Sequence, residues 1–189
     1  MSVRDIINLL SPRMMMHLVR VANMYRYNHV AEASHVTLGV AARLTPSVHL
    51  RYGRNISIGD RTVIGHNCGI WAGENAKVSI GSDVMFAPDC FVSATNYGMK
   101  AGQTIGSQEK IGKDVYIGND VWLARGVTVL MGVTIGDGCI VGANSVVTRD
   151  LPPGSIAAGI PARVIKMRPG AEDDHHSKNS SQRGEGEAN

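Results

Sequence analysis

The sequence lacks the features that mark membrane-spanning, secreted and nucleic-acid-binding proteins. It contains no apolar run of the roughly 20 residues that a membrane-spanning helix requires, and no signal peptide is recognisable at the start. The formal net charge is only +3, and the basic residues form no run with interleaved aromatic residues, which argues against a nucleic acid partner. We therefore expect a cytoplasmic protein whose mild positive charge is compatible with a small anionic ligand.

Aromatic residues are also scarce, at 5%, whereas glycine is abundant, at 22 of 189 residues. This composition suits a fold of short strands and tight corners with small aliphatic side chains between them. Aliphatic residues indeed recur at every sixth position over a long stretch: Ile111, Ile117, Leu123, Val129, Ile135, Val141 and Val147. A second set of small residues lies two positions before the last six of these: Val115, Val121, Val127, Val133, Cys139 and Ser145.

Each column of this repeat has a physical reason. Residues two apart on a strand point the same way, so Val115 and Ile117 face inward while Tyr116 faces outward. Residues that tolerate a left-handed backbone occupy the corner column: Asp114, Asp120, Gly126, Gly132, Gly138 and Asn144. A period of six fits neither an α-helix nor a hairpin meander, and it predicts an all-β fold, a parallel β-helix of stacked coils.

The same repeat extends upstream with two interruptions. Its hexads start at these residues: Ile58, Ile64, Ile70, Ile80, Phe86 and Val92. Four extra residues, around Gly73-Glu74-Asn75, lie between the hexads that start at Ile70 and Ile80. About thirteen extra residues lie between the hexads that start at Val92 and Ile111. Each insertion follows the third hexad of a coil. Both insertions therefore fall at one corner of the predicted coils. Loops at the edge of a regular scaffold are where function is usually placed.

The hexads Ile117–Trp122 and Ile135–Ile140, and the exit segments Val146–Ile156 and Ala158–Val164, resemble the hexapeptide-repeat acyltransferases. The resemblance covers roughly residues 45–168 and is greatest to sugar O- and N-acetyltransferases of surface-polysaccharide biosynthesis. It implies a left-handed β-helix of three hexads per coil, a homotrimer, and an acyl-CoA donor, such as acetyl-CoA, bound between subunits.

Three regions follow from these patterns. Residues 1–35 are expected to form a helical cap of two helices, residues 2–10 and Met14–Tyr27, over the open end of the β-helix. A membrane contact of these helices is the alternative, but a long basic face is missing. Residues 36–168 form the β-helix with a loop at 98–110 and a short C-terminal strand and helix within 156–167, and 169–189 is a disordered tail.

The three cysteines, Cys68, Cys90 and Cys139, fall at the small inward position of their hexads. We expect buried, reduced side chains that share one face of the coils. None forms a CxxC pair, and the adjacent His175 and His176 lie in the polar tail, so no metal site is predicted.

The resemblance also marks an expected catalytic position. In the family a histidine general base commonly ends the hexad that leads into the loop, in a stretch resembling Ser93–Gly98, where this chain has Asn96 followed by Tyr97. Tyrosine, with a reference pKa of about 10, is a poor base at neutral pH. Four explanations remain: another base (Glu109, Asp89 or His66) with Tyr97 structural or acceptor-binding, an amine acceptor that loses its proton late, a relay through Tyr97, or a catalytically silent protein.

The resemblance places the donor along the later coils. Trp122 lies where the family often has a tryptophan beside the active-site cleft, and Ala124 and Gly142 are small enough for the pantetheine arm to lie along the backbone. The family contacts the nucleotide and its phosphates near Thr148, Arg149, Arg163 and Lys166. The overall prediction is an acyl-CoA-dependent acyltransferase that acts on a hydroxyl or amine of a sugar or sugar nucleotide, the alternative being a silent hexapeptide-repeat scaffold.

Overall fold

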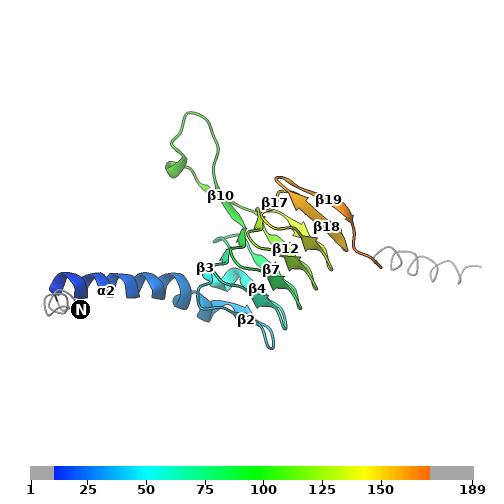
Figure 1. Cartoon of the computed structure of the whole chain (residues 1–189). Helices are drawn as coiled ribbons and strands as arrows, with labels where there is room; N and C mark the ends of the chain where they lie inside the picture. The colour runs from blue at the N-terminus through cyan, green and yellow to red at the C-terminus, as the bar shows by residue number, and fades with distance from the viewer. Residues whose placement is uncertain (1–10, 171–189) are drawn as a thin grey trace, which may run out of the picture.

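The computed structural model describes residues 11–170. Short parallel strands follow one another around a stack of coils, as Figure 1 shows, and group into three faces. The first face contains β1 (Thr37–Leu38), β4 (Ile56–Ile58), β7 (Val78–Ile80), β12 (Val115–Ile117) and β15 (Thr134–Ile135). The second contains β2 (Arg43–Leu44), β5 (Val63–Ile64), β8 (Met85–Phe86), β13 (Trp122–Leu123), β16 (Ile140–Val141), β18 (Ser155–Gly159) and β19 (Ala162–Met167). The third contains β3 (His49–Arg51), β6 (Gly69–Trp71), β9 (Phe91–Ser93), β14 (Thr128–Val129) and β17 (Val146–Val147).

The core is a stack of like residues from successive coils. On the first face Ile58 pairs with Ile80, Ile80 with Ile117, and Ile117 with Ile135, and the most exposed of these four side chains is only 4% accessible. Burial of one such side chain contributes roughly 1.5–3 kcal/mol, so the six-residue period has a direct energetic cause. The predicted parallel β-helix is confirmed.

The predicted corners are confirmed at five of the six positions, whereas Asp114 does not have a positive φ. Asp120 and Asn144 have φ values of 52° and 55°, and Gly126, Gly132 and Gly138 have φ values between 68° and 77°. These are left-handed conformations that Asp, Asn and Gly tolerate better than other residues.

The start of the long repeat was misassigned. Ile111 is not an inward residue of a coil: it lies in β11 (Lys110–Gly112), is 39% exposed, and pairs antiparallel with Asn96 of β10 (Thr95–Tyr97). Residues 98–109, including the 3-10 turn η4 (Ile105–Ser107), form an arm that projects from the coils (Figure 1). A period of six cannot distinguish a coil from the returning strand of a loop, because both are short extended segments. The next coil therefore starts at β12.

The cysteines are buried and free, as expected, but they do not share one column. Cys68 and Cys90 stack at the corner that enters the third face, with Val127 continuing their column. Cys139 stacks on Val121 at the corner that enters the second face. The error follows from the misassigned hexad at Ile111, which shifted the predicted face of every later hexad by one.

The N-terminal helix α2 (Pro12–Tyr25) begins at a Ser11 cap whose hydroxyl accepts from the Met14 N–H, and the proline occupies the first turn, where no N–H is needed. A π-helix η1 (Arg26–Ala31) and a 3-10 turn η2 (Ala33–His35) connect it to the coils, and a second 3-10 turn, η3 (Gly53–Asn55), lies between β3 and β4. The helix α2 has no buried residue and projects away from the coils (Figure 1). The helix predicted over residues 2–10 lies outside the described residues.

The C-terminal end differs from the prediction. The expected short helix is wrong: β18 continues the second face by pairing with β16, and β19 returns antiparallel beside β18. Gly159, with φ at 106°, begins the reversal between them. The tail prediction for residues 171–189 lies outside the described part of the chain. Within residues 11–170, no helix combines the length and apolar character needed to cross a membrane.

Candidate active site

A pocket of about 500 Å³ lies on the third face, at the corner where the chain leaves it. Its lining comes from three coils, the four-residue insertion and the base of the arm. The lining residues are Arg51, Tyr52, Trp71, Ala72, Gly73, Glu74, Asn75, Phe91, Ser93, Thr95, Asn96, Tyr97, Glu109, Lys110 and Gly112. Both insertions of the repeat therefore meet at one site, as the sequence predicts.

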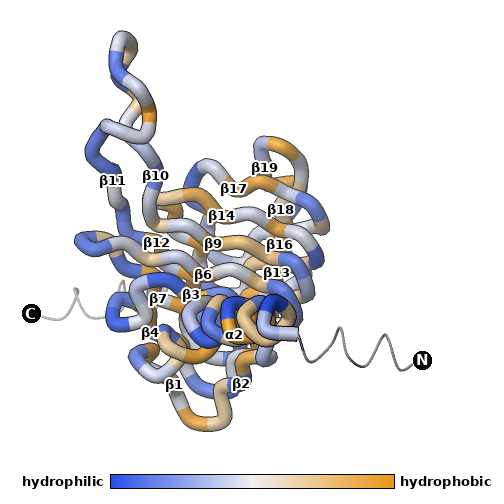
Figure 2. The backbone as a smooth tube through the Cα atoms, turned by 90° about the vertical axis from the view of Figure 1, so that its left-hand side faces the viewer, coloured by the Kyte–Doolittle hydropathy of each residue, from blue (hydrophilic) through white to orange (hydrophobic). Residues whose placement is uncertain are grey.

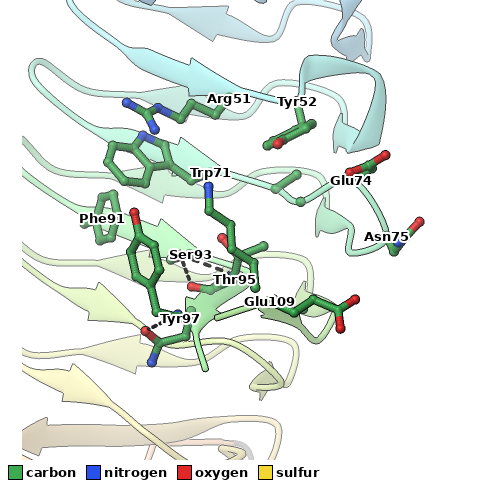
Figure 3. Close-up of a pocket in the computed structure, with 15 residues that line it drawn as sticks. Arg51, Tyr52, Trp71, Glu74, Asn75, Phe91, Ser93, Thr95, Tyr97 and Glu109 are labelled. Atoms are coloured by element: carbon green, nitrogen blue, oxygen red, sulfur yellow. Dashed lines mark hydrogen bonds between the residues drawn. The ribbon is translucent and has the colours of Figure 1, made fainter. Parts of the chain in front are cut away.

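One wall of the pocket is aromatic (Figure 3). Trp71 and Phe91 stand on neighbouring coils in an edge-to-face arrangement with ring centroids 4.9 Å apart, and the Arg51 guanidinium carbon lies 4.2 Å from the centre of the Trp71 ring. Gly69 makes room for this wall, because a Cβ there would lie 2.6 Å from the Phe91 ring. The indole N–H of Trp71 is buried and has no hydrogen-bond partner among the described residues.

The base of the arm supplies the opposite rim. The Tyr97 backbone N–H donates to Asn96 Oδ1 at 2.8 Å, and the Lys110 ammonium lies 5.6 Å from the Tyr97 ring centre. Figure 3 shows the Tyr97 ring pointing toward Phe91 and Trp71, and the side chain is 49% exposed. The tyrosine therefore faces the pocket rather than the core.

Two carboxylates lie on the side of the pocket away from Tyr97. Glu109 precedes β11, and Glu74 belongs to the insertion after β6. Figure 3 shows the Glu109 carboxylate directed away from the Tyr97 ring, toward Asn75. The pocket thus combines an aromatic wall, a cationic edge and an acidic edge, which is the mixture expected where a few polar groups orient a small molecule.

Comparison with known proteins decides the family. Residues 110–149 match the family model described as bacterial transferase hexapeptide (six repeats), and residues 55–85 match the hexapeptide repeat of succinyl-transferase. Over 154 residues the chain is 34% identical to galactoside O-acetyltransferase of Escherichia coli (strain K12). The aligned region covers 76% of this chain and 74% of that protein. The chain belongs to the hexapeptide-repeat acyltransferases.

Solved structures of other acyltransferases agree. A galactoside acetyltransferase in complex with coenzyme A is 33% identical, with a TM-score of 0.68 over 79% of both chains. A hexapeptide-repeat acetyltransferase of Vibrio cholerae in complex with acetyl coenzyme A is 26% identical, with a TM-score of 0.66 over 84% of this chain and 91% of that one. The protein is therefore an enzyme of the acyltransferase class.

The three alternative bases of this acyltransferase do not all lie at the pocket. Glu109 lines the pocket. His66 and Asp89 lie at the corner between the second and third faces, outside the pocket lining: His66 Nδ1 lies 3.3 Å from the Ser47 hydroxyl, and the Asp89 carboxylate accepts from the Arg125 guanidinium at 2.9 Å.

The candidate donor residues lie mostly on another face. Trp122 stands outward on the second face, 45% exposed, between Met85 and Ile140. Ala124 and Gly142 follow the strands of that face, and Arg163 and Lys166 lie on β19 at its end.

Thr148 and Arg149 follow β17 of the third face instead. One chain therefore does not bring the Tyr97 pocket and the Trp122 surface together.

Most of the pocket lining was not predicted from the sequence as part of the site, including Arg51, Trp71, Glu74 and Phe91. A signal for them existed, since Trp71 and Phe91 occupy outward positions of two consecutive third-face strands in a chain with few aromatics. Within residues 11–170, no group of three or more His, Cys, Asp or Glu side chains is placed to hold a metal ion.

Proposed function

We propose that the protein transfers an acyl group, most simply acetyl, from acyl-CoA to a hydroxyl or amine of a sugar or sugar nucleotide. The observation that carries this proposal is the pocket at the base of the arm, whose lining combines the Trp71–Phe91 wall with polar residues that include Asn96 and Glu109. A sugar presents an apolar ring face and a polar rim, and this pocket offers partners for both. The similarity to galactoside O-acetyltransferase supports a sugar acceptor, and a role in surface-polysaccharide biosynthesis is the corresponding cellular setting.

The chemistry requires a nucleophilic oxygen or nitrogen of the acceptor to attack the thioester carbon. The acceptor proton passes to a base, and coenzyme A leaves as the thiol. Among the three alternative bases, Glu109 is the one that lines the pocket, and we assign it the proton acceptor role. Tyr97, with Asn96 beside it, orients the acceptor against the aromatic wall.

The donor is proposed to lie along the second face, beside Trp122, Ala124 and Gly142, with its phosphates near Arg163 and Lys166, and with Thr148 and Arg149 at its outer end. Gly142 favours this path, because a Cβ there would lie 2.9 Å from the Ala158 methyl group and would occupy space that the glycine leaves open to the pantetheine arm. Since the pocket and this surface lie on different faces, a complete site needs two chains side by side. In a homotrimer, one repeated contact between neighbouring chains would form three such sites.

The test is an acceptor screen. The protein is incubated with acetyl-CoA and a panel of galactosides, glucosides, amino sugars and sugar nucleotides, while thiol release is followed and product mass is measured. We expect acceptor-dependent release of coenzyme A, with Glu109→Gln lowering kcat by about 10²-fold, the lower range for general-base catalysis. Binding of acetyl-CoA without turnover on any sugar would reject the proposal and favour a silent scaffold.

The donor assignment has its own test. Replacing Arg163 and Lys166 together with alanine removes charge-assisted phosphate contacts, so the KM for acetyl-CoA should rise by about tenfold or more while kcat stays within a few-fold. The double substitution Arg43→Ala/Arg54→Ala removes the same charge from the other end of the coils and serves as control. An unchanged KM in the Arg163/Lys166 variant would move the nucleotide site elsewhere.

A further inference from the structure

The helix α2 is exposed along its whole length. None of its residues is buried, and Figure 1 shows it projecting from the coils. Its apolar side chains are between 41% and 58% exposed: Met15, Met16, Leu18, Val19, Val21 and Met24. Scattered exposed apolar residues need no explanation, but Met15, Leu18, Val19 and Val21 lie together on one side of the helix, and such a group indicates a surface that is covered by something else.

The helix is also amphipathic. At the angular spacing of an α-helix, Met15, Leu18, Val19 and Val21 fall on one side with Met14, Ala22 and Tyr25. Arg13 and Arg20 are two turns apart and fall together on the opposite side, next to His17, where Met16 and Met24 flank them. Figure 2 views α2 nearly end-on and shows both hydrophilic and hydrophobic segments around it.

Its charge has one sign. No aspartate or glutamate occurs from Ser11 to Ala31, while arginines stand at 13, 20 and 26. The ion pairs recorded for residues 11–170 involve Arg61, Arg125 and Arg168, so none of the helix arginines is neutralised there.

We propose that α2 binds an anionic phospholipid membrane surface, lying in its plane. The apolar side chains around Leu18 and Val19 enter the boundary of the acyl chains, and Arg13 and Arg20 meet the lipid phosphates. A second copy of the helix complements this surface less well, because it brings arginines of the same sign together. A basic protein surface is also a poor partner, because the segment from Ser11 to Ala31 has no acidic side chain with which it could form ion pairs.

The attachment of α2 makes this contact consequential for the enzyme. Tyr25 at its end donates from its hydroxyl to the Pro46 carbonyl at 3.0 Å, and His29 in η1 contacts the Val48 carbonyl at 2.9 Å through Nδ1. These contacts join the helix to the first coil. Binding of α2 therefore holds the coils near the membrane surface.

Vesicle co-sedimentation tests the proposal directly. The full chain should sediment with phosphatidylcholine vesicles containing about one quarter phosphatidylglycerol, at least about tenfold more tightly than with pure phosphatidylcholine, and salt should weaken the binding. Arg13→Gln/Arg20→Gln should weaken it by about 25-fold, at about fivefold for each basic residue. Leu18→Ser/Val19→Ser should weaken it by at least about tenfold.

Two control variants are matched to these changes. Val40→Ser alters an apolar side chain that is 77% exposed but lies in the first coil, and Arg43→Gln/Arg54→Gln alters net charge equally. Both should bind like the wild type, and thermal unfolding by circular dichroism should be the same for all variants, because α2 has no buried residue. Absence of wild-type binding to the anionic vesicles, or equal loss in the controls, would overturn the proposal. So would a Leu18→Ser/Val19→Ser variant that changes oligomeric mass and leaves vesicle binding intact, which would assign α2 to contacts between chains.

Discussion

Replacement of Tyr97 separates the ways in which this acyltransferase can handle the acceptor proton. The Tyr97 hydroxyl makes no hydrogen bond within residues 11–170, and the side chain is 49% exposed. Tyr97→Phe keeps the ring and its position 5.6 Å from the Lys110 ammonium. The free energy of unfolding should therefore change by less than about 0.5 kcal/mol, so any loss of activity reports chemistry.

If Tyr97 orients the acceptor, Tyr97→Phe should keep kcat within a few-fold. Tyr97→His places an imidazole at the same position, and imidazole is a better base near neutral pH than either a carboxylate or a phenol. With a hydroxyl acceptor we expect kcat to rise by about 10²-fold, which corresponds to about 2.7 kcal/mol in the activation barrier. With an amine acceptor the gain should be small, because an amine attacks before its proton leaves.

The assay is thiol release at saturating acetyl-CoA over a range of pH, since a histidine base adds a rise in kcat near its own titration. Tyr116, which is 48% exposed on the first face and outside the pocket, supplies the matched control Tyr116→His, which should leave kcat unchanged. If Tyr97→Phe abolishes turnover but leaves donor binding intact, the hydroxyl takes part in proton transfer and our reasoning fails. If neither substitution at Tyr97 alters the rate, the pocket is not the acceptor site.

Three further predictions concern stability and reactivity. Ile117→Ala empties a position that is 3% exposed between two other isoleucines, and it should cost roughly 2–5 kcal/mol in urea unfolding. Cys68 and Cys90 should resist thiol reagents in the folded protein, because both side chains are buried and reagents cannot reach them. The interaction between the two thiols raises the pKa of Cys90 and lowers that of Cys68, so burial alone protects Cys68; rapid labelling of both would contradict this. Burial and the neighbouring His29 lower the pKa of His49 below its usual 6.5, so its contribution to stability is present above that pH and is lost as pH falls through the lowered value. The rings of His49 and of His29 in η1 have centroids 4.2 Å apart, so protonation of His49 should weaken the packing of η1 on the coils. Hydrogen-exchange protection of residues 26–31 should therefore decrease below about pH 6, and constant protection would refute this link.

Much of the fold was predictable because it depends on local repetition. Stacking of like residues requires an aliphatic side chain at every sixth position, and a corner requires a residue that accepts positive φ, so both constraints are written directly into the chain. Ile135 and Asn144 illustrate the two columns, and the structure confirms both. The two insertions were also assigned correctly to one corner, since counting hexads is enough to locate them.

The errors all concern which segments lie beside one another. Ile111 keeps the period of six but pairs with Asn96 across the arm, and this displaced the predicted face of Cys139. A short strand and a helix were expected within 156–167, but residues 162–167 form β19, because the free edge of β18 offers backbone hydrogen bonds that an isolated segment does not have.

The sequence by itself determined the coils, the corners, the corner that carries the arm, and the unusual Tyr97, because each depends on residue type at a fixed spacing. Only the tertiary structure decided what surrounds Tyr97. The Trp71–Phe91 wall, the Arg51 stack and the Glu109 edge come from different coils and from the arm, which approach one another through stacking and loop closure. The same holds for α2, whose amphipathic pattern fits a cap as well as a free helix: it is exposed because it projects from the coils and contacts them at its last residue, Tyr25, which no local pattern encodes.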